Sequence, residues 1–317
     1  MLRGMGYGAY LKAAISGERL QFVGFAIVDD ADLVETAKSM VATFLEVATQ
    51  LQNSLSAWEG GLRATDGAIV PEKSHWYLID FVWKDGCWEY ASVEETPAGI
   101  QVRDCNGTVK LLERLPVFEA RRTLGIRLAP DGNNDAEVKF LRERTLEWAD
   151  CIRMGHLPRR LVWELMQTTI LKSIQYPLLV TMLSQKQCTL IMAPLLKQGL
   201  SSSGVVHSIP RKVVYGPTKF QGLGVSNLFT FQKVEHIFRS LKYCWAEEHL
   251  TGQFIRQSLE ATKLEIGCEG PLLSKSFHDL GMLATPMWIT HTWEYLSQTQ
   301  MAMEDDEADL RLFREGD

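Results

Sequence analysis

The hydrophobic pattern of the sequence changes its period near residue 133, and this change limits the possible fold more than any other feature. Before that point, short aromatic and β-branched runs are separated by turn dipeptides, a pattern that predicts β-hairpins. Lys84-Asp85-Gly86 lies between HWYLIDFVW and CWEYASV, and Asn106-Gly107 lies between IQVRDC and TVKLLERL. From Asp135 onward, apolar residues recur every three or four positions, which predicts helices. The expected fold class is therefore α+β.

The helical part of the pattern can be divided further. Pro158 and Gly199 are typical of a helix start and a helix end, respectively. Together with the spacing of the apolar residues, they predict helices over residues 138–152, 158–173, 185–199 and within 226–265 and 286–303. The acidic sequence EDDEAD beyond them is expected to be a solvated tail. In the first part of the chain, one more strand is expected within residues 119–128.

Two adjacent carboxylates, Asp29 and Asp30, end an uncharged run of strand-forming residues, LQFVGFAIV. Asp32 and Glu35 then have the spacing of a capping box, so we expect a helix that begins at Asp32 and stops at Gly60-Gly61. Aspartates are also common in turns, where they bind backbone N–H groups. The pair alone therefore does not separate a metal site from an ordinary turn, and the neighbouring segments must decide.

After this helix comes GGLRATDGAIVPEKS, which contains Lys73. The run IVDD, the helix and this segment together resemble reverse transcriptases of the non-LTR retrotransposon type, whose palm carries an aromatic-x-Asp-Asp hairpin, a helix and a Gly-x-x-x-x-Lys segment. ARRTLGIRLAPDG, residues 120–132, is similar to the family's Leu-Gly primer grip, and YGPTKFQGLGVSNL, residues 215–228, is similar to its Gly-Leu-Gly element beyond the thumb. The resemblance spans about residues 5–245. Ile27 stands where the family has an aromatic residue, which leaves both acids in place.

The resemblance implies an RNA-directed DNA polymerase, a nucleotidyltransferase that uses two Mg²⁺ (or Mn²⁺) ions. Asp29 and Asp30 would bind metal, Lys73 would lie near the triphosphate of the dNTP, and Leu124 and Gly125 would position the primer. The family's fingers, its nucleotide-selecting segment and its other metal-binding Asp lie upstream of the Asp-Asp pair, where this chain has only 28 residues. We therefore expect a truncated enzyme that is inactive alone, and whether this chain is itself an enzyme stays open.

The resemblance also divides the chain into a partial palm over residues 1–132, with an antiparallel sheet and a helix, a mostly helical thumb over 133–200 and a C-terminal helical region over 201–317. Residues 103–243 hold 21 Lys and Arg against 11 Asp and Glu, while both flanking segments are net acidic. Phosphate contacts need cations, so we expect an RNA or DNA template-primer as the partner. The candidate contacts are Arg121, Arg122, Arg142, Arg144, Arg159 and Arg160. Any one such cation is more commonly part of a solvated helix face.

Other classes of function find little support in the sequence. Apolar runs are broken by charges before 18 residues and no signal-peptide core is present, so we expect an intracellular protein, in the nucleus or cytoplasm, without membrane contact. The six cysteines form no Cys-x-x-Cys pair, and His236 and His249, which flank Cys244, are not spaced to share a helix face. Two alternatives to a polymerase fragment remain open: a catalytically inert nucleic-acid-binding remnant, and an unrelated α+β interaction protein.

Overall fold

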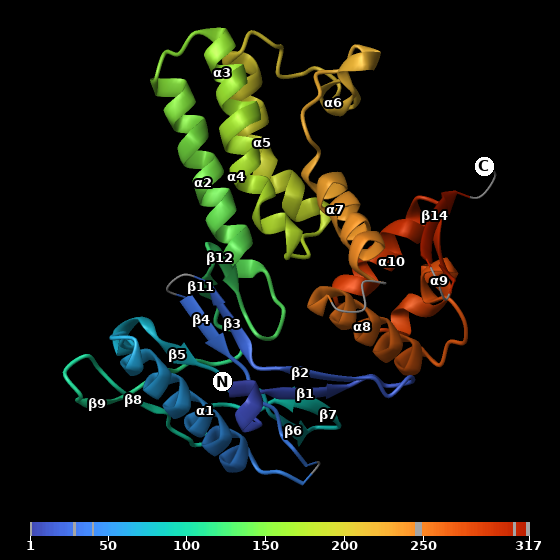
Figure 1. Cartoon of the computed structure of the whole chain (residues 1–317). Coiled ribbons are helices and arrows are strands. Elements are labelled where there is room, and N and C mark those ends of the chain that lie inside the picture. Colours follow the sequence, from blue (N-terminus) through green and yellow to red (C-terminus); the bar gives the residue numbers. More distant parts are fainter. Residues whose placement is uncertain (1, 28–29, 40, 245–248, 307–308, 315–317) are drawn as a thin grey trace. The chain divides into compact units, whose positions relative to one another are not determined.

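The structure, a computed structural model, describes residues 2–27, 30–39, 41–244, 249–306 and 309–314. Backbone contacts divide the chain into two compact units, Met1–Asn133 and Asn134–Asp317, which we call the first and the second unit. The first unit contains short strands and one long helix, and the second is mainly helical (Figure 1). The expected α+β class is confirmed. In the described part of the chain, no helix is both long and apolar enough to cross a membrane.

Short strands surround a single long helix in the first unit. Its elements are η1 (Leu2–Met5), β1 (Ala9–Lys12), β2 (Arg19–Phe22), β3 (Gly24–Ile27), β4 (Asp30–Leu33), α1 (Phe44–Ala64), η2 (Pro71–Lys73), β5 (His75–Trp76), β6 (Phe81–Lys84), β7 (Cys87–Tyr90), β8 (Gln101–Arg103), β9 (Val109–Leu111), β10 (Glu113–Arg114), β11 (Arg121–Thr123) and β12 (Ile126–Leu128). The pairs β1–β2, β3–β4, β6–β7, β8–β9 and β11–β12 are antiparallel, whereas β5 and β10 are parallel. The expectation of an antiparallel sheet is met only in part. Each described strand has four residues or fewer here, and the strands form separate two-stranded ladders.

The turn dipeptides lie where the sequence pattern predicts them. Asp85 and Gly86 connect β6 to β7 with φ angles of 47° and 86°, as a tight hairpin turn requires. Asn106-Gly107 lies between the paired strands β8 and β9. Residues 119–128 were expected to form one strand, but they form the hairpin β11–β12, because Leu124 and Gly125 both adopt positive φ and reverse the chain.

The helix expected from Asp32 to Gly60-Gly61 has different ends in the structure. Asp32 pairs with Phe25 inside the β3–β4 ladder, so it cannot begin a helix. The helix α1 begins instead after Thr43, whose Oγ1 accepts the Glu46 N–H at 3.3 Å while Glu46 Oε2 accepts the Thr43 N–H at 2.9 Å. This is a complete capping box. Gly60 and Gly61 continue the helix because neither turns left-handed there; α1 ends at Ala64, and the left-handed residue comes only at Asp66, with φ of 64°.

One face of α1 builds the core of the first unit. The core contains Ala48 from α1 and residues from the strand region: Trp76, Leu78, Ile100, Val102 and Leu112. Phe44, Val47, Leu51 and Leu55 of α1 pack against it, at the three-and-four spacing that the sequence shows. Val41 and Leu45 were also expected on the buried face, but both are exposed because Val41 precedes the helix and Leu45 points away from the core. Because Trp76 of β5 belongs to the same core, packing against α1 positions β5.

The second unit is a series of helices that ends in a hairpin. Its elements are α2 (Asp135–Met154), α3 (Arg159–Leu165), the π-helical η3 (Met166–Ile170), α4 (Leu171–Gln175), η4 (Pro177–Leu179), α5 (Gln185–Ser202), α6 (Arg211–Tyr215), η5 (Thr218–Phe220), α7 (Leu228–Tyr243), α8 (Leu250–Ile266), η6 (Leu272–Ser274), α9 (Phe277–Leu280), η7 (Gly281–Leu283), α10 (Trp288–Gln298), β13 (Met301–Asp306) and β14 (Asp309–Arg314). The three helices expected between residues 138 and 199 are confirmed, the middle one being formed by α3, η3 and α4 in succession. Where a helix to residue 303 and an acidic tail were expected, the chain forms the β13–β14 ladder.

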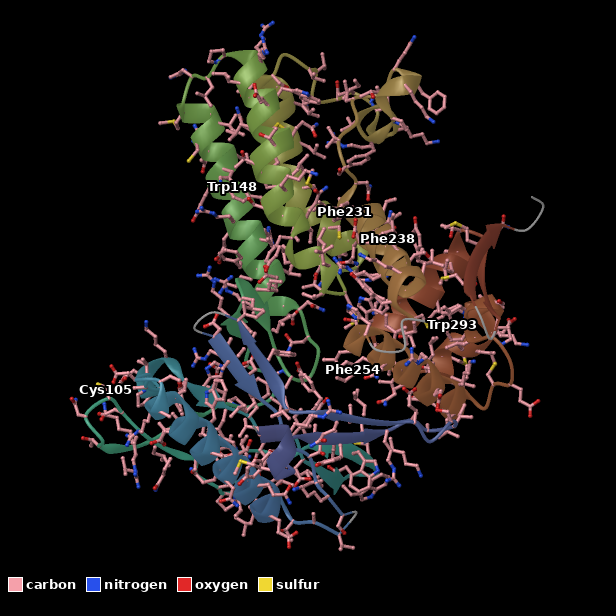
Figure 2. The ribbon with its side chains drawn as sticks, viewed as in Figure 1. Cys105, Trp148, Phe231, Phe238, Phe254 and Trp293 are labelled. Atoms are coloured by element: carbon pink, nitrogen blue, oxygen red, sulfur yellow. The ribbon has the colours of Figure 1, made fainter. Side chains whose placement is uncertain are left out.

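Two hydrophobic clusters hold the second unit together. The first lies among α2, α3 to α5 and the residues that follow α5, with Ile174, Leu195 and Val214 fully or almost fully buried, and Trp148 and Phe231 at its edge (Figure 2). The second joins α7, α8 and α10 around Trp293, whose indole N–H donates to Lys275 O at 2.7 Å (Figure 2). Because α7 contributes to both clusters, it connects them.

Candidate nucleic-acid interface

The β3–β4 hairpin positions the acidic pair that the sequence singles out. Asp30 opens β4 directly opposite Ile27, the last residue of β3, and its side chain is exposed. The partner acid, Asp29, lies outside the described residues. Asp32 follows Asp30 by two positions on the same strand, so the two side chains share one face of the hairpin. The structure therefore adds Asp32 to the acids expected at this site.

A glycine makes this hairpin possible. Gly24 has φ of 148°, and a Cβ built on it would lie 1.8 Å from Asp32 O, a contact that no side chain can make. We expect Gly24→Ala to open the hairpin, with backbone amides of β3 and β4 exchanging at least about thirtyfold faster, equivalent to about 2 kcal/mol. Hydrogen exchange measured by mass spectrometry would show this.

The matched control for that variant is Gly86→Ala in the β6–β7 turn. Gly86 also has positive φ, but a Cβ there meets nothing within 4 Å. This control should loosen β6–β7 modestly and leave β3–β4 unchanged. Normal exchange in β3 and β4 of the Gly24→Ala protein would contradict the close approach of Gly24 to Asp32.

Asp32 faces His75, which lies on β5. Burial raises the pKa of Asp32, and the charge of Asp30 raises it further, while His75 opposes both effects. Burial lowers the pKa of His75, and the charge of Arg121 lowers it further, against the attraction of Asp32. Burial therefore favours the neutral form of each group. Both groups are half-buried, so each keeps part of its surface accessible from solvent.

Arg121 holds the other side of this group. Its guanidinium binds Glu113 Oε2 and Glu119 Oε1, both at 3.2 Å, and Glu113 pairs with His75 across the parallel strands β10 and β5. Tyr77 O–H donates to Glu119 O at 3.0 Å, and its ring meets that of His75 edge to face, 5.5 Å between centroids. The charge of Arg121 is thus largely compensated by two carboxylates, so its described contacts position β11 rather than leave it open to phosphate.

The described residues do not supply the ligands that a two-metal site requires. Mg²⁺ prefers several carboxylate oxygens in octahedral geometry, and here Asp30 and Asp32 are the acids on the hairpin face. In the described ranges, no three His, Cys, Asp or Glu side chains are grouped to hold a metal ion. Asp29 and any further carboxylate would have to complete the set. No chemical step through a metal ion can be drawn from these contacts.

The other residues expected at this site lie apart or have a turn role. Lys73 ends η2 with its side chain exposed, and of the described contacts none joins it to Asp30; the neighbouring Glu72 binds Lys110 at 2.5 Å. Leu124 and Gly125 form the turn of the β11–β12 hairpin. Backbone exposed at such a turn can approach a nucleic-acid strand closely, since Gly125 has no side chain.

The basic residues expected in the helical part lie on exposed surfaces of the second unit. Arg142 and Arg144 lie on α2, where Arg144 binds Glu147 at 2.8 Å and covers the Trp148 ring at 5.2 Å. Arg159 and Arg160 open α3. Two cations at a helix N-terminus are disfavoured by the helix dipole, so this position gives Arg159 and Arg160 no stabilising interaction with the helix itself. Arg122, in the first unit, is exposed on β11 opposite Arg127.

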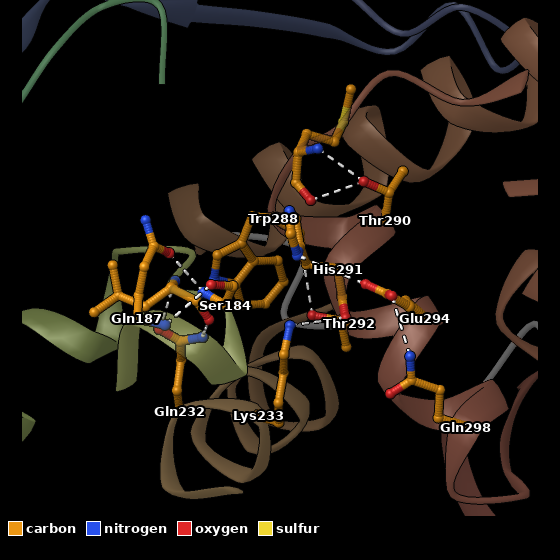
Figure 3. Close-up of polar contacts among 12 residues, drawn as sticks. Ser184, Gln187, Gln232, Lys233, Trp288, Thr290, His291, Thr292, Glu294 and Gln298 are labelled. Atoms are coloured by element: carbon orange, nitrogen blue, oxygen red, sulfur yellow. Dashed lines mark hydrogen bonds and ion pairs between the residues drawn. The ribbon is translucent and has the colours of Figure 1, made fainter. Parts of the chain in front are cut away.

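The sequence analysis missed a buried polar group in the second unit. Lys233 on α7 is almost fully buried, and its Nζ donates to His291 O on α10 at 3.0 Å (Figure 3). Gln232 beside it binds both the N–H and the C=O of Leu183 at 3.0 Å. His236, one turn further along α7, is fully buried. No local pattern marks these residues, because their burial depends on elements about 50 residues away in the chain.

Comparisons of this chain with protein-family models, with curated proteins and with solved structures found no match.

Proposed function

We propose that this chain is a palm-and-thumb part of an RNA-directed DNA polymerase of a mobile element, similar to non-LTR reverse transcriptases, and that it binds template-primer. The observation that carries the proposal is the β3–β4 hairpin, in which Asp30, one acid of the expected pair, lies opposite Ile27 at the start of β4. The helix α1 and then the Leu124-Gly125 hairpin turn follow in the same unit. This order of elements is the one that the family resemblance implies.

The proposed activity of the isolated chain is binding rather than nucleotide addition. Two-metal transfer needs a group of carboxylates around both ions, and the described residues do not form one. Primer extension with dNTP and Mg²⁺ or Mn²⁺ should therefore be undetectable. Clear extension that disappears in Asp30→Ala would show that the chain is a complete enzyme and overturn this part of the proposal.

Binding of template-primer would use the cations of the second unit. Duplex affinity depends on salt because each phosphate contact releases a counterion, with a slope of roughly 0.9 per contact. We expect Arg159→Gln together with Arg160→Gln to weaken binding of a primed duplex about tenfold at moderate salt and to lower the salt slope by about two. Fluorescence anisotropy with a labelled duplex over a salt series measures both quantities.

The matched control is Arg153→Gln at the end of α2. Arg153 is also exposed, but it binds Asp150 at 3.1 Å, so removing it should leave affinity and slope nearly unchanged. Equal binding at low and high salt would contradict a phosphate interface. A double variant with the wild-type slope would remove Arg159 and Arg160 from it.

The alternative, an interaction protein, has one observation of its own. The β6–β7 hairpin exposes four aromatic side chains on one face, in the cross-strand pairs Phe81–Tyr90 and Trp83–Trp88, with centroids 4.9 and 5.2 Å apart. Such a face is compatible with a protein partner, although the ring pairs also stabilise the hairpin itself. Absence of any binding to RNA or DNA would favour this reading.

A further inference from the structure

A long stretch of the second unit contains no acidic residue. Between Glu164 and Glu235 the sequence has no Asp or Glu over 70 residues, although the whole chain has 39. The stretch contains seven cations: Lys172, Lys186, Lys197, Arg211, Lys212, Lys219 and Lys233. All of them except Lys233 are exposed. The stretch itself supplies no carboxylate to compensate these cations, and a local excess of positive charge attracts anions.

Within this stretch, the loop after α6 is held in one shape by its own backbone. Leu223 N–H donates to Val213 O at 2.8 Å, Gly224 N–H to Gly216 O at 2.9 Å, and Val225 N–H to Val214 O at 3.1 Å. The Gly-Leu-Gly element of the sequence forms the return arm of this loop. The side chains of Val214 and Val225 are buried in the first hydrophobic cluster, which anchors both arms.

Glycine is required where the two arms meet. A Cβ built on Gly222 would lie 2.1 Å from Gly216 O, so any side chain at position 222 would force the arms apart. The loop is thus closed where its two arms meet, and η5 lies in the chain between them. Figure 1 shows α6 standing apart from the paired helices α2 and α5.

The tip of this loop presents an aromatic ring and a cation together. The side chain of Phe220 is 74% exposed, and Lys219 Nζ lies 4.8 Å from the centre of its ring. Arg211 and Lys212 are exposed on α6, at the start of the same loop. The Phe220 ring exposes apolar surface to water on a loop that backbone hydrogen bonds hold in one shape. The neighbouring cations favour an anionic partner, and the ring favours one that also has flat apolar groups.

Single-stranded nucleic acid has that chemistry. Its unpaired bases stack on aromatic side chains, and its phosphates bind nearby cations. We propose that the tip formed by Lys219 and Phe220 is a contact for single-stranded RNA or DNA, in which a base stacks on Phe220 and Lys219, Arg211 and Lys212 bind the flanking phosphates. The inference rests on the proposed function for the class of partner and adds a site to it.

The test compares single strands with primed duplex on the full chain. Stacking of one base contributes roughly 1–3 kcal/mol, so Phe220→Ala should weaken binding of a short oligouridine by about tenfold or more. Duplex affinity should change by less than about twofold, because its bases are already stacked. Phe220→Trp should retain single-strand binding. The control is Phe238→Ala, which removes a phenyl ring that is 56% exposed on α7 beside Glu235.

A covalent readout locates the contact directly. An oligonucleotide with one 5-iodouridine, irradiated on the wild-type chain, should crosslink to the peptide that contains Phe220. Crosslinking only to other peptides would overturn the inference, and so would equal single-strand binding by the wild type and Phe220→Ala. In either case, salt-dependent binding of duplex by the wild type would still support the proposed function. If the wild-type chain does not bind duplex at all, the proposed function is instead refuted.

An anionic membrane surface is the competing partner for a tip of this kind. Vesicles of phosphatidylcholine with phosphatidylserine provide that arm of the experiment. Binding of these vesicles that depends on Phe220, without any effect of Phe220→Ala on oligouridine, would overturn the nucleic-acid contact.

Discussion

Lowering the pH from 7 to 5 is expected to lower the free energy of unfolding of the second unit by about 2 kcal/mol through His236 alone. The imidazole is fully buried on α7, its Nε2 lies 3.1 Å from Leu178 O, and its ring lies 4.8 Å from that of Trp288. Burial, together with the charge of Lys233, lowers the pKa of His236 from 6.5 to about 3. This environment therefore destabilises the charged form of the imidazole relative to the neutral form.

The direction follows from where each state binds the proton. Below pH 6.5 the unfolded chain protonates His236, whereas the folded chain does so only near pH 3, so acid favours unfolding throughout that window. Above pH 6.5 His236 is neutral in both states and does not reduce the free energy of unfolding. As the pH falls from 6.5 toward 3, the free energy of unfolding decreases. Burial also lowers the pKa of His291, which acts in the same direction.

The measurement is urea unfolding at pH 7 and pH 5, followed by the protection of α7 and α10 amides. His236→Gln should lose about 2 kcal/mol less than the wild type over this interval, because Gln has no proton to gain. The exposed His207→Gln is the matched control and should keep the wild-type loss. An unchanged loss in His236→Gln would show that another group is responsible for the acid sensitivity.

The second large effect concerns Lys233. Burial lowers the pKa of this lysine from 10.5 to about 8, with Glu294 and Cys188 acting against that shift. The hydrogen bond from Lys233 Nζ to His291 O offsets only part of the free-energy cost of removing the ammonium group from water. Replacing buried ionic groups by well-packed apolar side chains of similar volume is often neutral or stabilising, because the cost of removing the charge from water is then avoided. We expect Lys233→Met to raise the free energy of unfolding at pH 7 by about 2 kcal/mol, after about 1 kcal/mol is lost with the hydrogen bond.

The pH dependence separates this effect from simple repacking. Between pH 8 and 10.5 the unfolded chain keeps the lysine proton that the folded chain has released, so the wild type gains stability as the pH rises. From pH 8 to 9 the gain is about 1 kcal/mol, and Lys233→Met should lack it. Above pH 9, Cys188 has the opposite effect because burial raises its pKa to about 12. A variant that is less stable than wild type at pH 7 would contradict the prediction.

Sequence reasoning succeeded where structure depends on near neighbours. Asp85-Gly86 and the helices of the second unit follow from turn chemistry and periodicity. The predicted start of α1 was wrong because the sequence contains two capping patterns, Asp32 with Glu35 and Thr43 with Glu46. Asp32 pairs with Phe25 in the β3–β4 ladder, so the helix begins at the second pattern. Only the ladder with β3 could decide between them.

The candidate sites show the same limit. Asp30 was found from its local pattern, whereas the approach of Asp32 and of Arg121 to His75 joins three segments far apart in the chain. The burial of Lys233 depends on α10. Local sequence gives a lysine on a helix no sign of what will cover it, so groups of this kind become visible only when the fold is known.

The parallel pair β5–β10 has a consequence for the order of folding. It joins His75 to Glu113 and encloses both the β6–β7 and the β8–β9 hairpins in one loop. Hairpins close in roughly 1–10 μs, but closing this long loop costs chain entropy before any contact rewards it. The two hairpins can therefore form first and shorten the path between β5 and β10. The contact between His75 and the β10–β11 segment depends on this pairing, so the group around His75 and Arg121 is complete only once β5 and β10 have met.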